Sequence, residues 1–490
     1  MFRHCKDVAA CKYYSVVIYL HTFVNDCFRL KITNRLILWS FVVFLCKYIY
    51  SAYIRTLCSI SEKNRTSLKK MKYYRLLLLL FIIPSSNLFA QTYDGFSNKE
   101  IQSVFKQWNL DNWDDGGEIS RYIFLNMPEF WTHAIINREG NIKSLKEDYR
   151  KEIDEFIVTS ELGQMTLQDY VKTSEKVDGM IILQGDHIVY EAYPRMFPND
   201  RHLYWSVSKV FASTLIAILE DRKQLDVTKP IEHYLPELKG SGWENVPVID
   251  ILDMASGIDC REWVDGAFEN PETCYYQFEA ALGFLKRTEK TADNAFEHIK
   301  TLSSAKTSGE VFEYTSVNTF VLSCLIERIT GLSYAKNIER EIWRKIGAES
   351  DAFITQTNGT SISHAGINST LRDLARFGYM FLNEGRSTEN AFVSNEYFDK
   401  IQKQGRPHLV TAYGSENYTL DKEVVRHNTY QWDKVMEDGD FYKGGFSGQG
   451  LYISPSRNLV IAFFGTADDD GVYNELDDIS RQVSKSDLFN

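Results

Sequence analysis

Short apolar runs separated by turn residues predict β-strands at two places far apart in the chain. Residues 177–183 and 187–191 are two such runs, and Gln184-Gly185-Asp186 between them is typical of a hairpin turn. Three further runs predict closing strands near the C-terminus, at residues 441–442, 450–453 and 459–464. The two groups enclose a long segment with a different pattern.

That segment, residues 206 to about 385, is predicted to be mainly helical with loops. After Val210, the buried positions of one helix recur at three-and-four spacing, at Phe211, Thr214, Leu215, Ile218 and Leu219. Leu476, Ile479 and Val483 have the same spacing and predict a final amphipathic helix. Helices are thus expected between the two groups of strands and after the second.

Residues 91–160 mix polar and aromatic positions and include Trp108, Trp113 and Trp131. We interpret them as an N-terminal extension that wraps the main domain, residues 161–490. A chain of 490 residues could hold two or three domains, but the motifs described below span most of it. One large two-lobed unit is therefore expected, and a hydrophobic content of 44% suffices for its core.

Residues 71–90 have the order of parts of a secretory signal peptide. Basic residues after Met71 precede an apolar run from Leu76 to Ile83, and small residues lead to Ala90. Cleavage is expected before Gln91, and the expected destination is the periplasm or, for a secreted protein, the medium. No cysteine follows the cleavage point, so a lipoprotein anchor is not expected.

Residues 1–70 precede this signal and form a doubtful leader. The simplest explanation is that translation starts at Met71; the alternative is a membrane-anchoring leader. Its apolar run 36–46 is shorter than the roughly 20 residues of a spanning helix. Residues 1–70 carry a charge of +9 and the whole chain −11, which leaves −20 for residues 71–490. An acidic body argues against nucleic-acid and anionic-membrane partners.

Five of the eight cysteines lie in the leader. Cys260 and Cys274 could close a short loop as a disulfide in an oxidising compartment, and Cys324 is expected to be a buried thiol on an apolar helix. No His/Cys cluster has metal-ligand spacing. We therefore expect no metal and no cofactor.

The candidate chemistry begins with Ser206 and Lys209. Ser-x-x-Lys is a weak pattern by itself, since it recurs at Ser67, Ser103, Ser303 and Ser333. Only Ser206 precedes a strongly apolar helix, which would place it and Lys209 in the first turn on one face. The positive end of the helix dipole favours a developing oxyanion, and desolvation can make Lys209 a base. The alternative is an N-cap serine beside a solvated lysine.

Two later motifs add groups for acyl transfer. Tyr314-Thr315-Ser316 offers a phenol that can carry a proton, and Lys443-Gly444-Gly445 offers a cation beside a glycine-rich strand. A nucleophilic hydroxyl, an amine and a phenol together make and break acyl-enzyme esters. Tyr314 could instead be a core aromatic residue, and Lys443 a surface lysine.

The segment from Trp205 to Lys209 resembles the nucleophile motif of the serine β-lactamase and penicillin-binding-protein superfamily. Further resemblances to its class C-like branch, closest to 6-aminohexanoate-dimer hydrolases, follow in order over residues 165–485; they are residues 252–258, 312–331, 364–378 and 445–455. This resemblance implies an α+β, β-lactamase/transpeptidase-like two-lobed fold, in which an antiparallel sheet of hairpin and closing strands is flanked by helices beside a mainly helical lobe.

The resemblance also implies roles for residues. Ser206 would be the nucleophile, Lys209 and Tyr314 would share proton transfer, and the backbone N–H groups of Ser206 and Phe446 would form the oxyanion hole beside Gly445. Lys443 would steady the Tyr314 phenolate or a substrate carboxylate. Substrate contacts are expected from Ser316, Asn318, Ser447 and Gln449. An α/β-hydrolase interpretation is weak, because Gly445 to Gln449 lacks the closing glycine of a nucleophile elbow.

The chain departs from class C β-lactamases at two motifs. It has Tyr-Thr-Ser where they carry Tyr-x-Asn, and Lys-Gly-Gly where they carry Lys-Thr-Gly. These departures favour a secreted carboxylesterase or amidase acting on a small ester, amide or peptide. A penicillin-binding D,D-peptidase or β-lactamase and a catalytically silent binding module are the alternatives.

Overall fold

The described part of the chain is built around an eight-stranded sheet. The structure, a computed structural model, describes residues 93–414, 418–467 and 475–489, which fall in the unit Gln91–Asn490. The doubtful leader 1–70 and the predicted signal peptide 71–90 lie outside the described residues. Within the described ranges, the helices are all too short or too polar to cross a membrane.

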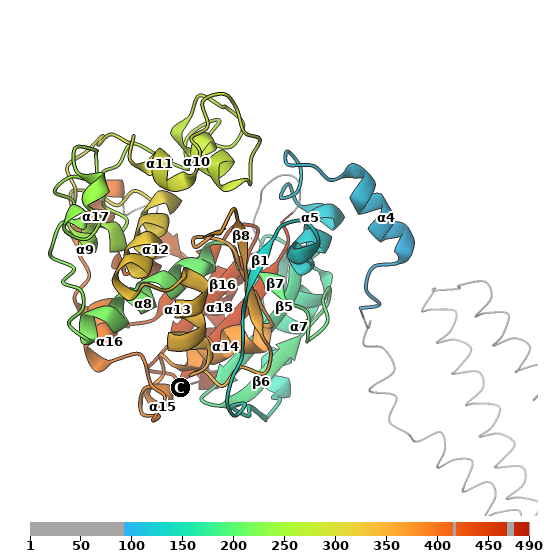
Figure 1. The fold of residues 1–490 in the computed structure, drawn as a ribbon. Coiled ribbons are helices and arrows are strands. Elements are labelled where there is room, and N and C mark those ends of the chain that lie inside the picture. The colour runs from blue at the N-terminus through green and yellow to red at the C-terminus, as the bar shows by residue number, and fades with distance from the viewer. Residues whose placement is uncertain (1–92, 415–417, 468–474, 490) are drawn as a thin grey trace, which may run out of the picture. The chain divides into compact units, whose positions relative to one another are not determined.

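The large sheet joins strands from both ends of the domain (Figure 1). Its order is β13 (His427–Thr429), β14 (Trp432–Val435), β15 (Phe441–Gly445), β16 (Gln449–Ser454), β17 (Leu459–Gly465), β5 (Val177–Gln184), β6 (His187–Ala192) and β2 (Lys146–Glu147). Only the β2–β6 pair is parallel among these. The predicted hairpin and closing strands are confirmed, and β17 pairs directly with β5.

Both faces of this sheet are covered. Ile181 and Leu183 point into one core, which the helices α8 (Lys209–Asp221), α12 (Ser316–Thr330) and α14 (Leu371–Tyr379) complete. Met180 and Ile182 point into a second core, formed with α7 (Leu167–Thr173) and α18 (Leu476–Ser484). Every residue of β16 and β17 is buried. Burial on both faces explains why these strands are continuous apolar runs rather than alternating ones.

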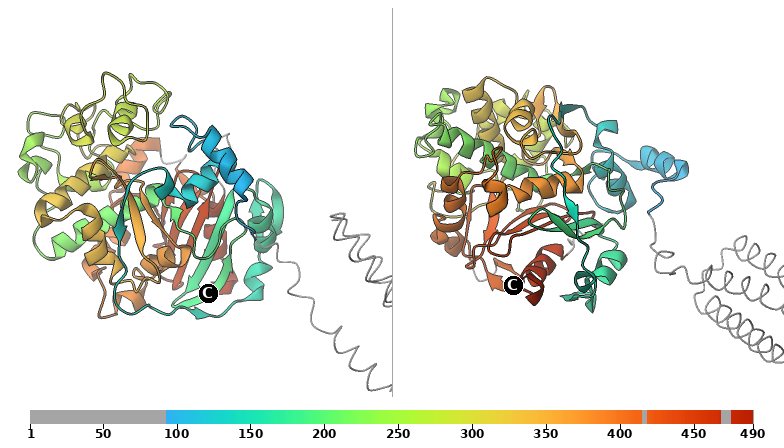
Figure 2. Two further views of the ribbon diagram at one scale, coloured as in Figure 1. Left: turned by 45° about the vertical axis from the view of Figure 1, so that its right-hand side comes forward. Right: turned by 90° about the horizontal axis from the view of Figure 1, so that it is seen from below.

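The helical part lies beside the large sheet, in green to orange in Figure 2. Its helices are α8 (Lys209–Asp221), α9 (Val248–Leu252), α10 (Cys274–Leu282), α11 (Ala295–Ile299), α12 (Ser316–Thr330), α13 (Tyr334–Ile338), α15 (Asn383–Arg386), α16 (Asn395–Lys403) and α17 (Pro407–Gly414). The helices against the large sheet are α14 (Leu371–Tyr379), α7 (Leu167–Thr173) and α18 (Leu476–Ser484). The predicted final amphipathic helix is therefore confirmed as α18.

A second sheet adds short strands to the segment 206–385, which is mainly helical with loops as the sequence predicts. Three strands lie there, β8 (Ala352–Thr357), β9 (Thr360–Ser361) and β10 (Ile367–Ser369), and they pair with β1 (His133–Ile136) and β7 (His202–Leu203). These strands are short and their partners are distant in sequence, so local periodicity gives little sign of them. Two further hairpins are β3–β4 (Ile157–Ser160, Gly163–Thr166) and β11–β12 (Thr419–Leu420, Glu423–Val424).

The N-terminal extension is packed into the domain, in the blue to teal part of Figure 1. It contributes α4 (Asn98–Gln107), α5 (Gly117–Leu125), α6 (Lys151–Asp154) and strands to both sheets. Arg121 of α5 forms a buried ion pair with Asp178 of β5, with 2.7 Å between Nε and Oδ1. A buried carboxylate without its partner is costly, so removing α5 would destabilise the sheet.

Candidate active site

Ser206 lies at the junction between the second sheet and α8. The segment Trp205–Ser208 forms a 3₁₀ turn, and α8 begins at Lys209. The sequence predicts Ser206 in the first turn of the α-helix, but Ser206 lies just before it. Ser208 anchors this turn because its Oγ accepts a hydrogen bond of 3.2 Å from the backbone N–H of Ile367 in β10. The partly exposed Ser206 Oγ is 2.8 Å from Lys209 Nζ. The predicted nucleophile and amine are therefore within hydrogen-bond distance.

Lys209 is fully buried, and the acceptors of its amine are uncharged. Besides Ser206, Nζ donates to Ser316 Oγ at 2.9 Å and to the backbone carbonyl of His364 at 3.2 Å. Burial lowers the pKa of Lys209 to about 7, and nearby Lys443 acts in the same direction while Glu262 opposes it. A substantial fraction of the amine is therefore neutral near pH 7, as a general base requires.

Tyr314 lies on the other side of Lys209, next to the second lysine. Lys443 Nζ donates to Tyr314 Oη at 3.1 Å, and both lysine amines lie near the face of the phenol ring, with Lys209 Nζ at 5.0 Å from the ring centroid. Burial raises the pKa of Tyr314 well above its usual range, with Asp433 and Glu262 adding to the effect. The phenol is thus held in its protonated form, which suits a proton donor.

Lys443 is fully buried and pairs with an acidic residue that the sequence did not single out. Its Nζ is 2.6 Å from Asp433 Oδ1, and the other carboxylate oxygen accepts the backbone N–H of Gly444 at 3.0 Å. Burial lowers the pKa of Lys443, whereas Asp433 raises it. Asp433 lies ten residues before Lys443 on the neighbouring strand, and only the β14–β15 pairing brings the two together.

The strand that carries the third motif runs against the nucleophile turn. A Cβ at Gly445 would lie 2.7 Å from the backbone oxygen of Tyr204, so only glycine allows this approach. Phe446 packs edge-on against Trp205, with 5.2 Å between ring centroids. The segments that precede and follow the two predicted oxyanion-hole residues are therefore in contact, as that hole requires.

Ser316 and Asn318, predicted to contact substrate, lie at the start of α12. Ser316 Oγ accepts from Lys209, and its backbone N–H donates to Glu262 Oε2 at 2.6 Å. Asn318 is fully buried, with its amide nitrogen 3.4 Å from Met254 Sδ. Ser316 therefore belongs to the hydrogen-bond network of Lys209, and the burial of Asn318 argues against direct substrate contact.

Ser447 and Gln449 do not face a substrate, which corrects the role that the sequence suggests for them. Both side chains are fully buried. Ser447 Oγ accepts the backbone N–H of Ala467 at 2.6 Å, and Gln449 exchanges two hydrogen bonds with the backbone of Gly465. They fasten the β15–β16 turn to the end of β17 and so hold Gly445 and Phe446 in place.

The match of this chain to known proteins covers the domain that holds these groups. The family model described as Beta-lactamase matches residues 167–483, about two thirds of the chain. The chain belongs to the β-lactamase family. It is an enzyme of that hydrolase fold, a serine hydrolase of the β-lactamase and penicillin-binding-protein superfamily.

Individual β-lactamase-family relatives support the branch that the motifs resemble. The 6-aminohexanoate-dimer hydrolase of Paenarthrobacter ureafaciens is 29% identical over 357 residues, which cover 72% of this chain and 86% of the relative. A solved structure from Bacillus anthracis, described as a "putative 6-aminohexanoate-dimer hydrolase", has a TM-score of 0.64 at 23% identity and covers 76% of this chain and 95% of its own. A β-lactamase/D-alanine carboxypeptidase from Yersinia pestis has a TM-score of 0.50 at 18% identity, covering 64% and 94%. The two structures establish the expected two-lobed fold.

The N-terminal extension, which precedes the β-lactamase match, reaches the nucleophile turn through Trp113. Its ring stacks on that of Trp205 with 5.1 Å between centroids, and Phe124 packs edge-on against the same ring. Trp205 has a φ of +48°, a left-handed conformation that costs a non-glycine residue about 1–3 kcal/mol. The aromatic cluster therefore holds a strained residue directly before Ser206.

We expect Trp113→Ala to lower the acylation rate constant about 10–100-fold, because a small shift of the Ser206 turn misaligns the nucleophile. The stability should also fall, since Trp113 is fully buried. Burst rate constants normalised to titrated active sites separate the two effects, because unfolded molecules do not contribute to them. Trp113→Phe should restore most of the rate; an unchanged rate constant in Trp113→Ala would contradict the positioning role.

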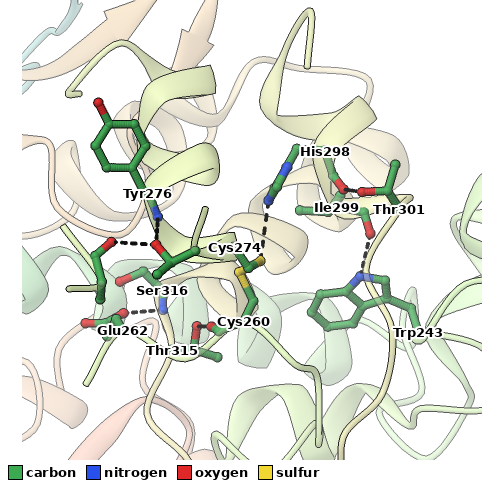
Figure 3. Close-up of a disulfide and its surroundings, with 12 residues drawn as sticks. Trp243, Cys260, Glu262, Cys274, Tyr276, His298, Ile299, Thr301, Thr315 and Ser316 are labelled. Atoms are coloured by element: carbon green, nitrogen blue, oxygen red, sulfur yellow. Dashed lines mark hydrogen bonds between the residues drawn. A yellow bond between two sulfur atoms is a disulfide. The ribbon is translucent and has the colours of Figure 1, made fainter. Parts of the chain in front are cut away.

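Cys260 and Cys274 form the disulfide that the sequence suggests (Figure 3). The bridged loop leads into the site, because Thr315 Oγ1 donates to the Cys260 carbonyl and Glu262 accepts from the Ser316 N–H. Glu262 thereby places its negative charge at the N-terminus of α12, where the helix dipole stabilises it. No sequence motif identifies Glu262. Its position two residues after Cys260, a candidate disulfide cysteine, is the signal that could have drawn attention to it.

Removing this disulfide with Cys260→Ser and Cys274→Ser should lower the free energy of unfolding by about 3 kcal/mol, the expectation for a loop of this length. The bridge spans 14 residues of sequence separation. Urea titrations of wild type and variant, each with and without reductant, measure the change. Reductant should shift the wild type and leave the double variant unmoved; identical midpoints in all four titrations would show that the bridge adds no stability.

Two observations bear on the expectations that the protein holds no metal and that Cys324 is a buried thiol. The fold brings ligating atoms of Cys260, Cys274 and His298 within 4.8 Å of one another, although their sequence spacing gives no sign of it. The two sulfurs are bonded to each other and cannot act as thiolate ligands. Cys324 is a free thiol on a half-buried residue, and burial raises the pKa of the thiol.

Proposed function

We propose that this enzyme is an exported serine hydrolase that cleaves small ester or amide bonds through an acyl-Ser206 intermediate. The observation that carries the proposal is the 2.8 Å contact between Ser206 Oγ and a buried lysine whose pKa is lowered to about 7. A serine hydroxyl is a weak nucleophile until a nearby base removes its proton. Lys209 supplies that base at neutral pH.

Acylation begins when the neutral Lys209 amine accepts the Ser206 proton and Oγ attacks the substrate carbonyl carbon. The backbone N–H groups of Ser206 and Phe446 stabilise the oxyanion of the tetrahedral intermediate. Tyr314, whose raised pKa keeps it protonated, gives its proton to the leaving alkoxide or amine and regains one from Lys209. The bond between carbonyl carbon and leaving group breaks, and the acyl group stays on Ser206.

Deacylation uses the same groups with water as the nucleophile. Lys209 or Tyr314 accepts a proton from the water, whose oxygen attacks the acyl carbon. The ester bond to Ser206 breaks and Oγ recovers a proton, which releases the carboxylic acid. The enzyme residues thus return to their starting protonation states.

The comparison with 6-aminohexanoate-dimer hydrolase supports a linear amide as one substrate type. Ester cleavage is supported by the site itself, since the same attack on a carbonyl serves esters and amides. The Tyr-Thr-Ser and Lys-Gly-Gly motifs argue against efficient β-lactam hydrolysis. The proposed export rests on the signal-like segment 71–90 and is supported by the disulfide, which persists in oxidising compartments.

The test is a burst assay of purified enzyme with p-nitrophenyl butyrate, followed by mass spectrometry of the quenched protein. We expect a burst of p-nitrophenol proportional to the enzyme and a butyryl adduct on the peptide that contains Ser206. A labelled penicillin run in parallel should give little or no stable adduct. Stoichiometric penicillin labelling of Ser206 without ester turnover would favour a penicillin-binding function, and no adduct with any ester, amide or lactam would overturn the proposal.

A further inference from the structure

Lys443 is a buried cation whose charge is already used inside the site. Its ammonium is bound by Asp433 at 2.6 Å and by the Tyr314 hydroxyl at 3.1 Å. The second oxygen of Asp433 accepts the Gly444 N–H, so the carboxylate is fixed to the strand that carries Lys443. The ion pair is therefore a rigid part of the third motif, not a mobile surface contact.

The other charges near Lys443 make its surroundings unfavourable for an anion. Glu262 is a buried carboxylate whose charge acts on Lys209, Tyr314 and Lys443. Burial lowers the pKa of Lys209, which reduces the positive charge available to offset this carboxylate. Gly444, directly after Lys443, has no side chain that could donate a hydrogen bond to an anion. A substrate carboxylate placed beside Lys443 would thus meet Asp433 at close range.

We propose that Asp433 determines substrate specificity: by neutralising Lys443, it restricts the enzyme to substrates whose leaving group carries no carboxylate beside the scissile bond. This inference rests on the proposed ester and amide hydrolysis and names the class of leaving group that the site accepts, one without a carboxylate next to the scissile bond. Asp433 acts through Lys443 and is a positioning residue, not a catalytic one. The role of Lys443 that remains is to hold the Tyr314 hydroxyl.

The test uses two esters with the same acyl group, p-nitrophenyl butyrate and 3-carboxy-4-nitrophenyl butyrate. Their leaving groups differ by one carboxylate, and dividing each kcat/KM by the ester's hydroxide-catalysed rate removes the difference in intrinsic reactivity. Wild type should prefer the neutral ester at least about tenfold. Asp433→Asn keeps the shape and one carbonyl oxygen, which can accept from Gly444, but its NH₂ group cannot accept from Lys443 and the charge is lost. It should shift the preference toward the carboxylate ester about tenfold, mainly through KM.

The matched control is Asp477→Asn. Asp477 pairs with Lys434 at 3.3 Å, and Lys434 is the next residue along β14 and so points to the opposite face of the sheet from Asp433. The control loses one carboxylate of the same sign without touching Lys443, and its preference should equal that of wild type. Because Asp433 raises the pKa of Lys443, the gain in Asp433→Asn should be larger at pH 6.5 than at pH 8.

The outcomes separate this inference from the proposed function. If wild type hydrolyses the neutral ester and the carboxylate ester with equal efficiency, the inference is overturned and the proposed function stands. This outcome does not depend on whether Asp433→Asn folds. An unchanged preference in folded Asp433→Asn would overturn it as well. No turnover of either ester by wild type would overturn the proposed function and this inference with it.

Discussion

Replacing Ser206 by alanine is expected to remove the burst and to lower kcat/KM for p-nitrophenyl butyrate about 10⁴–10⁶-fold, up to the size of the loss when a serine hydrolase loses its nucleophile. Ser206 is partly exposed, and its Oγ accepts a hydrogen bond of 2.8 Å from Lys209 Nζ. The stability should change little, because Lys209 keeps its bonds to Ser316 and to the His364 carbonyl. Stopped-flow burst amplitudes and thermal unfolding measure the two quantities.

The chain supplies a matched control for this variant in Ser333. It has the same Ser-x-x-Lys pattern with Lys336, but it caps α13, where its Oγ accepts the Lys336 N–H at 3.3 Å. Ser333→Ala should keep the full burst and lose about 1 kcal/mol of stability, the usual cost of an N-cap. A full burst in Ser206→Ala would exclude Ser206 as the nucleophile, whatever the control shows.

The parts of the site that lie close together in sequence were predictable, since local geometry decides them. A three-residue separation at the start of an apolar helix places Ser206 and Lys209 within reach of each other, even though the turn is 3₁₀ rather than α-helical. The hairpin β5–β6 and the strands β15 to β17 also follow from local patterns, because their apolar runs are long and end at turn residues. Tyr314 and Lys443 needed the family resemblance as well.

The parts that were missed depend on strand pairing and on distant partners. Asp433 has no motif of its own and gains its place only when β14 pairs with β15. Glu262 reaches the N-terminus of α12 because the Cys260–Cys274 bridge and Thr315 hold its loop. Ser447 shows the converse error: a polar residue after the third motif suggests a substrate contact, but it bonds to the backbone at the end of β17.

The activity should rise with pH up to a plateau, because Lys209 acts as a base only without its proton. Burial lowers the pKa of Lys209 to about 7, so the amine is mostly protonated below pH 7 and mostly neutral above it. Because only the neutral amine can accept the Ser206 proton, kcat/KM should be level above about pH 8 and fall tenfold per pH unit well below pH 7. Measurements from pH 5 to pH 9 with p-nitrophenyl butyrate, corrected for spontaneous hydrolysis, test this profile.

Lys209→Arg should lose about 10³-fold in kcat/KM above pH 8, where the wild-type profile is level, since a guanidinium stays protonated and cannot serve as the base. Lys336→Arg is the matched control, because Lys336 belongs to the same pattern at Ser333 and its side chain is half-exposed. The control should follow the wild-type profile. A profile that keeps rising through pH 9 instead of levelling off, or an active Lys209→Arg enzyme, would assign the proton transfer to Tyr314 instead. Burial raises the pKa of Tyr314, so its phenolate forms only at alkaline pH.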